Sequence, residues 1–424
     1  MSEQPQPQRL RIGEGRISGH LSIFLAVLSL GAVICFHFPE FFTTPEFRAV
    51  YSVDLLRWVL LAALVLAFGF ALTSFLLSGQ TKLGLAGVVI SSLAIVLGGN
   101  TVEIQDFDQS IFTISLDWLL IDILVLSAIF IPLEVFLPKR TEQTKFHLEW
   151  KTDLVYFAVG HLLVQFTAVA VQAPAEAIFG GWGLEGIQST VSSWPFLVQL
   201  TLAMLVADLF QYAAHRSFHA NRFLWRFHAV HHSIRAVDWL AGSRLHLVDI
   251  FLTRAFSYFP LYVLGFSMPV FYAYVAIVAL QAVAAHANIR IPFGPLKYLL
   301  VTPQYHHWHH SDDPDFYDKN FAIHFPLIDR LFGTYHLPGD EWPESMGLGE
   351  EQFPKGYLRQ LVYPFRNDPK TADVWIPAGG RPMADTYGRL WEGEQVNGCG
   401  REPIPGVGDR SGTGTAPAPQ AKFR

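Results

Sequence analysis

Charge is scarce in this chain. Asp, Glu, Lys and Arg make up only 16% of its 424 residues, whereas 51% of the residues are hydrophobic. Soluble globular domains carry about 25% charged residues, and a mean hydropathy of +0.29 is also high for that class. The composition therefore indicates an integral membrane protein. The formal net charge of −6 is small for this length and gives no sign of a nucleic-acid partner.

Cysteine is nearly absent as well. The chain has two cysteines, Cys35 inside an apolar run and Cys399 in a polar C-terminal segment. Such different surroundings argue against a disulfide and against a thiolate metal site. Any metal bound by this protein must therefore be held by other side chains.

Long apolar runs are present instead. A helix must offer about 20 apolar residues to cross the roughly 30 Å hydrocarbon core of a bilayer. The candidate runs are 20–37, 53–78, 116–137, 152–180 and 193–214, a shorter one at 83–98, and a hairpin-like pair at 249–265 and 268–287. We expect an all-α, polytopic transmembrane bundle of about eight spans. Segment 83–98 is the weakest of them and could be re-entrant.

Basic residues orient this bundle and help to divide the chain. Lys and Arg gather in alternate connections, whereas 99–115 and 181–192 carry neither, so the N-terminus and a histidine-rich cap are predicted to face the cytoplasm. We expect four parts: an N-terminal tail at 1–19, N-terminal transmembrane helices at 20–140, a catalytic domain at 141–345 and a polar extension at 346–424. The Gly, Pro, Ser and Thr content of the extension predicts disorder from about residue 395.

The histidines are unevenly distributed. Of 17 in the chain, five lie within residues 215–232 and four within 306–310. Eight of them form three sets at helical spacing: HxxxH at His215 and His219, HxxHH at His228, His231 and His232, and HxxHH at His306, His309 and His310. Residues three and four apart share one helical face, so we expect each set to point its rings in one direction.

This spacing indicates a metal site. Imidazole suits zinc, iron, copper and nickel, and eight imidazoles exceed what one ion can use, so two ions are implied. A structural zinc would be closed by four ligands, often including cysteine. A redox-active pair with open positions fits better. The rival hypothesis is a histidine-rich membrane metal transporter or sensor. Transporters place ionisable ligands in mid-span, whereas these histidines flank the spans.

These motifs resemble the fatty acid hydroxylase and sterol desaturase superfamily of membrane di-iron enzymes. The resemblance covers about 150–336 and rests on "ADLFQYAAHRSFHANRFLWRFHAVHHS", followed by "RLH", "AHAN", "TPQYHHWHHS", "DKN" and "IDRLFGTY". The eight histidines of the family pattern map onto the eight named above. One departure is "NFA" at Asn320–Ala322, where many members have "NYG", which puts the local turn in doubt.

The resemblance implies an oxidoreductase. Members use two iron ions, molecular oxygen and two externally supplied electrons to hydroxylate or desaturate an unactivated C–H bond of a lipid, and zinc can replace iron on purification. The substrate could be a sterol, a hopanoid-like lipid, an acyl chain, an ether lipid or a carotenoid. The sequence carries no nucleotide-binding glycine loop, iron–sulfur cysteine cluster or cytochrome b5 signature. A separate ferredoxin or cytochrome b5-type protein with its reductase is therefore expected to dock on the basic cytoplasmic face.

Six further residues are candidates around the metal site. His246 and His286 lie where the family often has a histidine that ligates or supports the metals, although a histidine at a helix end could instead bond a backbone carbonyl. Asp208 could bond a ligand ring or pair with an arginine, and Asn288 could orient a ring or cap a helix. His307 is expected behind the ligands or at the surface. Asp312 could bond an imidazole or lie in a solvated turn.

Overall fold

In the computed structural model, all residues that can be described belong to one compact unit, Met1–Pro382. The structure describes residues 13–44, 48, 51–78, 81–104, 113–144, 146–348 and 353–366. Residues 1–12 of the predicted tail, and the segment predicted to be disordered from about residue 395, lie outside this set.

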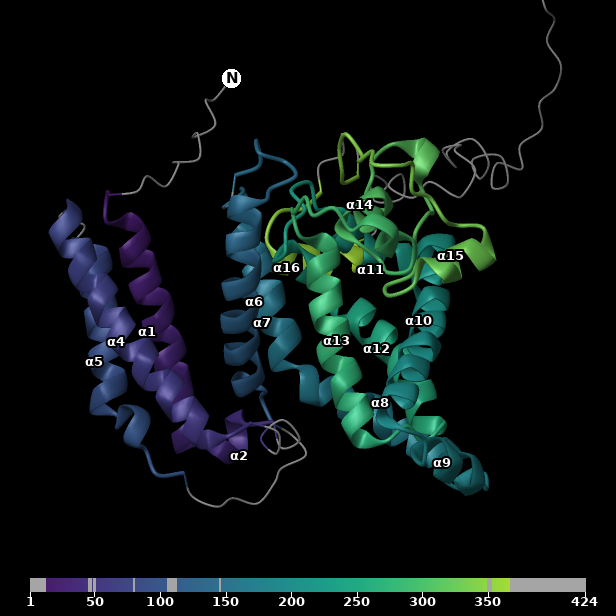
Figure 1. The fold of residues 1–424 in the computed structure, drawn as a ribbon, viewed down its shortest axis with the longest axis horizontal. Coiled ribbons are helices and arrows are strands. Elements are labelled where there is room, and N and C mark those ends of the chain that lie inside the picture. The colour runs from purple at the N-terminus through teal and green to yellow at the C-terminus, as the bar shows by residue number, and fades with distance from the viewer. Residues whose placement is uncertain are drawn as a thin grey trace, which may run out of the picture. The chain divides into compact units, whose positions relative to one another are not determined.

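Three long helices that lie side by side form the N-terminal part (Figure 1): α1 (Arg16–His37), α4 (Val53–Ser78) and α5 (Thr81–Val96). The short α2 (Pro39–Phe42) follows α1. These helices are apolar on all faces. This suits a lipid environment, where the backbone N–H and C=O groups must bond one another within the helix. α1 and α5 approach closely at Gly87 of α5, where an added Cβ would lie only 1.9 Å from Oγ of Ser22 in α1. Small residues permit such contacts between membrane helices.

The remaining helices surround or support the histidines. They are α6 (Leu116–Phe136), α7 (Trp150–Leu162), α8 (Val164–Phe179), α9 (Glu185–Ser192), α10 (Phe196–Ala220), α11 (Arg222–His232), α12 (Leu247–Val263), α13 (Met268–His286), α14 (Pro303–His309), α15 (Pro326–Phe332) and α16 (Tyr357–Val362). Five short 3₁₀ helices occupy Gly99–Thr101, Ala241–Ser243, Gly294–Tyr298, Pro314–Phe316 and Tyr363–Phe365. Between residues 13 and 366, the described β-pairing is limited to isolated bridges such as Pro138 with Ile289. The all-α prediction is confirmed.

The number of spans is slightly lower than expected. Among the described residues, six helices are long and apolar enough to cross a membrane, α1, α4, α5, α6, α10 and α13, and the bent pair of α7 and α8 makes up to seven. The segment 83–98 lies within the candidate span Thr81–Thr101, which begins with α5. The predicted 152–180 run is broken between α7 and α8, whose axes differ by 47°. The run at 249–265 is α12, which has only 17 residues, contains Pro260 and packs against α8 and α10.

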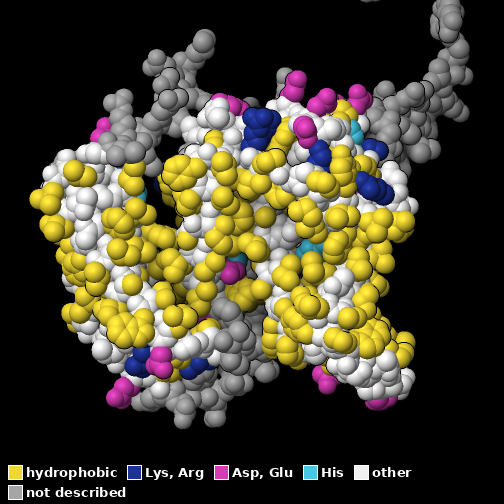
Figure 2. Space-filling model, in the orientation of Figure 1, with side chains coloured by type: hydrophobic (Ala, Val, Ile, Leu, Met, Phe, Trp, Pro, Cys, Tyr) yellow, Lys and Arg dark blue, Asp and Glu magenta, His cyan; other side chains and the backbone are white. Residues whose placement is uncertain are grey.

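The surface agrees with a bilayer environment. Figure 2 shows hydrophobic side chains over most of the visible face, with most of the charged side chains near its upper and lower ends. Large apolar side chains are widely exposed on the predicted spans, including Leu76 at 77% and Phe136 at 79%. Exposed apolar surface on this scale is uncommon in soluble monomers and is expected of a lipid-facing wall.

A cap formed by α11, α14, α15 and α16 lies at one end of α6, α10 and α13 (Figure 1). Buried carboxylates of the membrane helices hold its loops. Asp208 of α10 accepts the backbone N–H groups of Ile323, His324 and Phe325 at 2.8 to 3.0 Å. Backbone donors buried without a partner are costly, so these bonds fix the loop over the helix end.

Glu134 of α6 likewise accepts backbone N–H groups, from two other loops. Its Oε1 accepts the backbone N–H of Trp239 at 2.9 Å and of Asn288 at 2.8 Å. This one carboxylate therefore ties α6 to the segment before α12 and to the end of α13.

Replacing Glu134 by Ala should destabilise the cap. The change leaves two buried N–H groups without an acceptor, at a cost of about 2 to 5 kcal/mol in unfolding free energy. Thermal unfolding of the detergent-purified protein measures this, and the exposed Glu103→Ala serves as the control. An unchanged melting temperature for Glu134→Ala would show that these bonds do not hold the cap.

Candidate metal centre

Nine buried or half-buried histidines form two adjacent groups. The five-histidine cluster consists of His215, His219, His228, His232 and His309, and the four-histidine cluster of His231, His286, His306 and His310. Within each cluster, one ring nitrogen from every histidine lies within 4.8 Å of the others. The clusters adjoin, since the ring centroids of His232 and His310 are 4.7 Å apart. The structure thus brings together all eight histidines of the three motifs, with His286 as a ninth.

Four helix segments supply these rings. α10 carries HxxxH in its last turns, and α11 follows directly because the side chain of Asn221 caps it by accepting the N–H groups of Phe223 and Leu224. His286 ends α13. α14 is short and almost wholly buried, with Thr302 as its N-cap. The histidines therefore lie where spans end and the cap begins.

Each HxxHH motif serves both clusters. On α11, His228 and His232 join the five-histidine cluster while His231 joins the other. His306 of α14 and His310, the C-cap residue that follows it, join the four-histidine cluster, whereas His309 of α14 joins the five-histidine cluster. The expectation that each HxxHH set points one way was wrong, because adjacent helical residues differ by about 100° in direction. Each HxxHH motif therefore supplies histidines to two neighbouring clusters from one helical segment.

In the five-histidine cluster, acceptors hold the outer ring nitrogens of four of the histidines. Nδ1 of His228 donates to Asp249 at 2.7 Å and Nδ1 of His219 to Asp318 at 3.1 Å. The other two bonds go to backbone carbonyls: His215 to Phe321 at 2.8 Å and His309 to Lys319 at 2.7 Å. Such bonds set the tautomer, with hydrogen on Nδ1 and a lone pair on Nε2, and fix the ring orientation.

In the four-histidine cluster, two of the histidines have an acceptor on the outer ring nitrogen. Nδ1 of His231 donates to the carbonyl of Arg244 at 3.2 Å, and Nδ1 of His286 donates to that of Ala282 at 2.7 Å. Arg244 is itself buried and fixed, because its guanidinium bonds Asp153 and Glu149.

His147 completes the support under Arg244. Its Nε2 lies 3.2 Å from Asp153 and 3.4 Å from Asp238. Although burial lowers the pKa of His147, its bonds to the two carboxylates outweigh burial and raise the pKa to about 9. A cation here helps to balance the buried acids.

The inward nitrogens stand in contact with one another. Nε2 of His215 lies 3.0 Å from Nε2 of His228, and Nε2 of His286 lies 3.2 Å from Nε2 of His231. In all four rings Nδ1 already carries the hydrogen, so these contacts bring lone pairs together in neutral rings. Burial also lowers the pKa of His228 and His231 well below the usual value, which disfavours an imidazolium. A shared cation satisfies this arrangement.

Two further nitrogens support a metal. Nε2 of His232 and Nε2 of His309 are buried and have no hydrogen-bond partner within the described part of the chain. A donor set made only of imidazole, without thiolate or carboxylate, suits iron, zinc, copper or nickel. The residues fit the two metal ions predicted from the sequence.

Other candidates lie around the clusters rather than in them. His246 caps α12, accepting Val248 N–H and bonding the carbonyl of Leu361, and it belongs to neither cluster. His307 donates from Nε2 to the carbonyl of His286 at 3.2 Å, which places it behind that ring.

The three polar candidates contact backbone or surface groups. Among the described residues, Asp208 bonds the N–H groups of the 323–325 loop and neither a ligand ring nor an arginine. Asn288 exchanges two hydrogen bonds with the backbone of Arg140. Asp312 accepts from Ser345. Asp208 acts on the centre indirectly, because its loop follows the Phe321 carbonyl that orients His215.

Asp249 and Asp318 were not found from the sequence. Asp249 stands three residues after His246 at the start of α12, and Asp318 opens the "DKN" motif. Asp318 and Asn320 both adopt positive φ values, 58° and 60°, although neither is glycine. This conformation costs energy and is kept where surroundings enforce it. Here it presents the Asp318 carboxylate to His219 and the Lys319 carbonyl to His309.

A membrane helical bundle with two buried, all-histidine clusters at the ends of its spans defines the class of membrane histidine-box proteins. The sequence profile of the family described as fatty acid hydroxylase matches residues 200–334, a segment that contains all nine clustered histidines. Residues 200–334 therefore match the fatty acid hydroxylase family, and the resemblance drawn from the motifs is confirmed over this segment.

Curated relatives carry related names. The chain is 36% identical over 173 residues to ornithine lipid hydroxylase OlsE of Rhizobium tropici, covering 41% of this chain and 52% of that one. It is 33% identical over 206 residues to alkylglycerol monooxygenase of Danio rerio, covering 46% of each. It is 27% identical over 140 residues to methylsterol monooxygenase 1-1 of Arabidopsis thaliana, covering 32% and 47%. The chain spans about half the length of these relatives. No solved structure matches it.

Replacing Asp249 by Asn should weaken metal binding at the five-histidine cluster. The amide removes the charge that favours hydrogen on Nδ1 of His228, and such outer partners are typically worth 10- to 100-fold in metal affinity, so a loss of about that size is expected. Competition of the bound metal against a chelator measures the loss. The exposed Asp315→Asn is the matched control. Equal affinities in the two variants would contradict the role given to Asp249.

Proposed function

We propose that this protein is a membrane oxidoreductase that uses molecular oxygen to hydroxylate a lipid at a di-iron centre. The observation that carries the proposal is the pair of adjacent histidine clusters, in which Nε2 atoms lie 3.0 to 3.2 Å apart in rings whose Nδ1 atoms donate elsewhere. The relatives named above are called hydroxylase or monooxygenase. These names favour oxygen insertion over desaturation.

The proposed ligands are all nine clustered histidines. Bound iron would supply oxygen activation and electron transfer, which zinc cannot because it has no redox chemistry at these potentials. The protein's part is to hold the rings in a fixed tautomer and to keep the centre dry. Asp249, Asp318 and the carbonyls around them do the first. Phe218 and Phe321, both buried against cluster rings, contribute to the second.

The substrate is proposed to be a membrane lipid. His219 and His286 lie in the last turns of α10 and α13, so a chain in the bilayer can approach the centre along the helix ends. An apolar cluster from α8, α10, α12 and α13 fills the space beneath, including Ala207, Leu261 and Val270. Ornithine lipid, alkylglycerol and methylsterol, named for the relatives, are the first compounds to try.

The cap is proposed to face the cytoplasm and to receive electrons there. The positive-inside distribution of Lys and Arg supports this orientation. A separate ferredoxin or cytochrome b5-type protein would bind the exposed cap surface, where Lys and Arg side chains lie at the upper end of the face seen in Figure 2.

Replacing His309 by Ala should abolish turnover. The chain is expressed in cells supplied with oxygen-18 gas, and the lipids are analysed by mass spectrometry. The intact protein should yield a lipid with one labelled oxygen, whereas His309→Ala should lower product more than about 100-fold, because a ligand is lost from the centre. The exposed His20→Ala is the control for a histidine away from the clusters. Normal product from His309→Ala, or oxygen derived from water, would refute the proposed function.

A further inference from the structure

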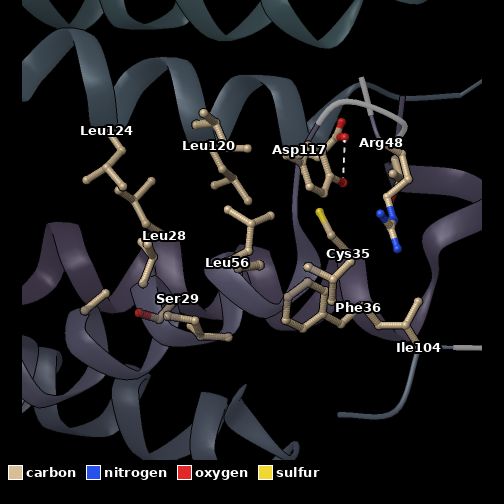
Figure 3. Close-up of a pocket in the computed structure, with 18 of the residues that line it drawn as sticks. Leu28, Ser29, Cys35, Phe36, Arg48, Leu56, Ile104, Asp117, Leu120 and Leu124 are labelled. Atoms are coloured by element: carbon tan, nitrogen blue, oxygen red, sulfur yellow. Dashed lines mark hydrogen bonds between the residues drawn. The ribbon is translucent and has the colours of Figure 1, made fainter. Parts of the chain in front are cut away.

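The N-terminal helices enclose an elongated pocket that the metal centre does not use. It lies between α1, α2, α4 and α6. Figure 3 shows Leu28, Leu56, Leu120 and Leu124 along its length. Small residues such as Ala63 also line it and leave the width open. A pocket of this composition inside a membrane protein suits a hydrocarbon chain.

One end of the pocket is polar. Asp117, the second residue of α6, lies there and is already satisfied by its own chain. Its Oδ1 accepts N–H and Oγ1–H of Thr44, both at 3.0 Å, and N–H of Trp118 at 2.8 Å. Its Oδ2 accepts the hydroxyl of Tyr51 at 3.3 Å. This carboxylate therefore has several donors without using Arg48.

Arg48 lies at the same end. Its guanidinium lies 5.4 Å from the centroid of the Tyr51 ring, and within the described part of the chain no hydrogen bond or ion pair reaches it. Figure 3 shows Arg48 at the same end of the pocket as Asp117, and Cys35, Phe36 and Ile104 also line that end. A cation among apolar side chains is costly unless an anion or water meets it. The pocket thus combines an apolar channel with a cationic end.

The pocket is distinct from the metal centre. Its polar end is at the first turn of α6, whereas the metal centre adjoins the other end, where Pro138 pairs with Ile289 soon after His286. A helix of 21 residues is about 30 Å long, so the two sites lie near opposite faces of a bilayer.

We propose that this pocket binds a membrane lipid with an anionic phosphate head. The acyl chain lies between α1, α4 and α6, and the phosphate meets Arg48. A guanidinium matches phosphate oxygens through paired N–H donors, so it discriminates a phosphate head from an uncharged one. The lipid is bound in addition to the substrate of the metal centre, and the proposal holds whether or not that centre is active.

Lipid retention tests the proposal. The full chain is incubated with vesicles that contain phosphatidylglycerol and diacylglycerol with the same acyl chains, in equal amounts. It is then extracted in mild detergent, and native mass spectrometry counts the lipids retained per chain. The variants are Arg48→Gln, which removes the cation, and Ala63→Phe, which fills the pocket. Arg57→Gln is the matched control, because Arg57 lies near the same end of α4 and bonds the carbonyl of Val102 outside the pocket.

The intact protein should retain phosphatidylglycerol about tenfold over diacylglycerol, the size expected of one charge-assisted contact. Arg48→Gln should bring the ratio near one, Ala63→Phe should lower retention of both lipids, and Arg57→Gln should behave as the intact chain. Unchanged metal content and melting temperature show that the variants are folded. An unaltered ratio in Arg48→Gln, an equal loss in Arg57→Gln, or no preference in the intact protein would overturn the proposal.

Discussion

The structure depends on contacts between imidazole nitrogens that are unfavourable without a cation. Nε2 of His286 lies 3.2 Å from Nε2 of His231, and Nε2 of His215 lies 3.0 Å from Nε2 of His228, in rings whose Nδ1 atoms already donate to carbonyls or to a carboxylate. Burial lowers the pKa of His228 and His231 well below the usual value. Lone pairs held this close in a desolvated site repel one another unless a positive ion lies among them. The surrounding fold opposes their separation: helix ends aim the rings, and carboxylates and carbonyls on the outer nitrogens prevent them from turning away.

The same principle, that each buried polar group must find a partner, explains how the cap is joined to the membrane helices. Asp208 and Glu134 are costly in apolar surroundings, yet each accepts two or three backbone N–H groups from cap loops. Within the cap itself, Asp329 of α15 accepts N–H of Phe321 and Ala322 at 2.8 Å. The loops that carry the carbonyls for the histidines are thus positioned by the membrane helices.

Much of this could be predicted from the sequence. Apolar runs locate membrane helices because lipid leaves backbone groups no outside partner. Regular histidine spacing identified eight of the histidines that the structure gathers into two clusters, and the family resemblance added His286. Partners across long sequence distances could not be predicted. Asp249 reaches His228 only after α11 and α12 fold against each other, and the carbonyl of Lys319 reaches His309 through a loop with two left-handed residues. The split of each HxxHH between two clusters depends on the position of a second helix. His246 stands in the sequence where the family often has a metal-supporting histidine. In the structure, however, it is the N-cap of α12, and its ring bonds the backbone.

We expect the two histidine clusters to hold two metal ions side by side. The most direct test is to load the purified, full-length protein with iron, count the bound ions per chain, and record X-ray absorption at the iron edge. Two ions per chain, one for each cluster, surrounded by imidazole nitrogen with no sulfur neighbour, are the expected result and would support this arrangement. One ion or none at saturation, or a first shell containing sulfur, would contradict it.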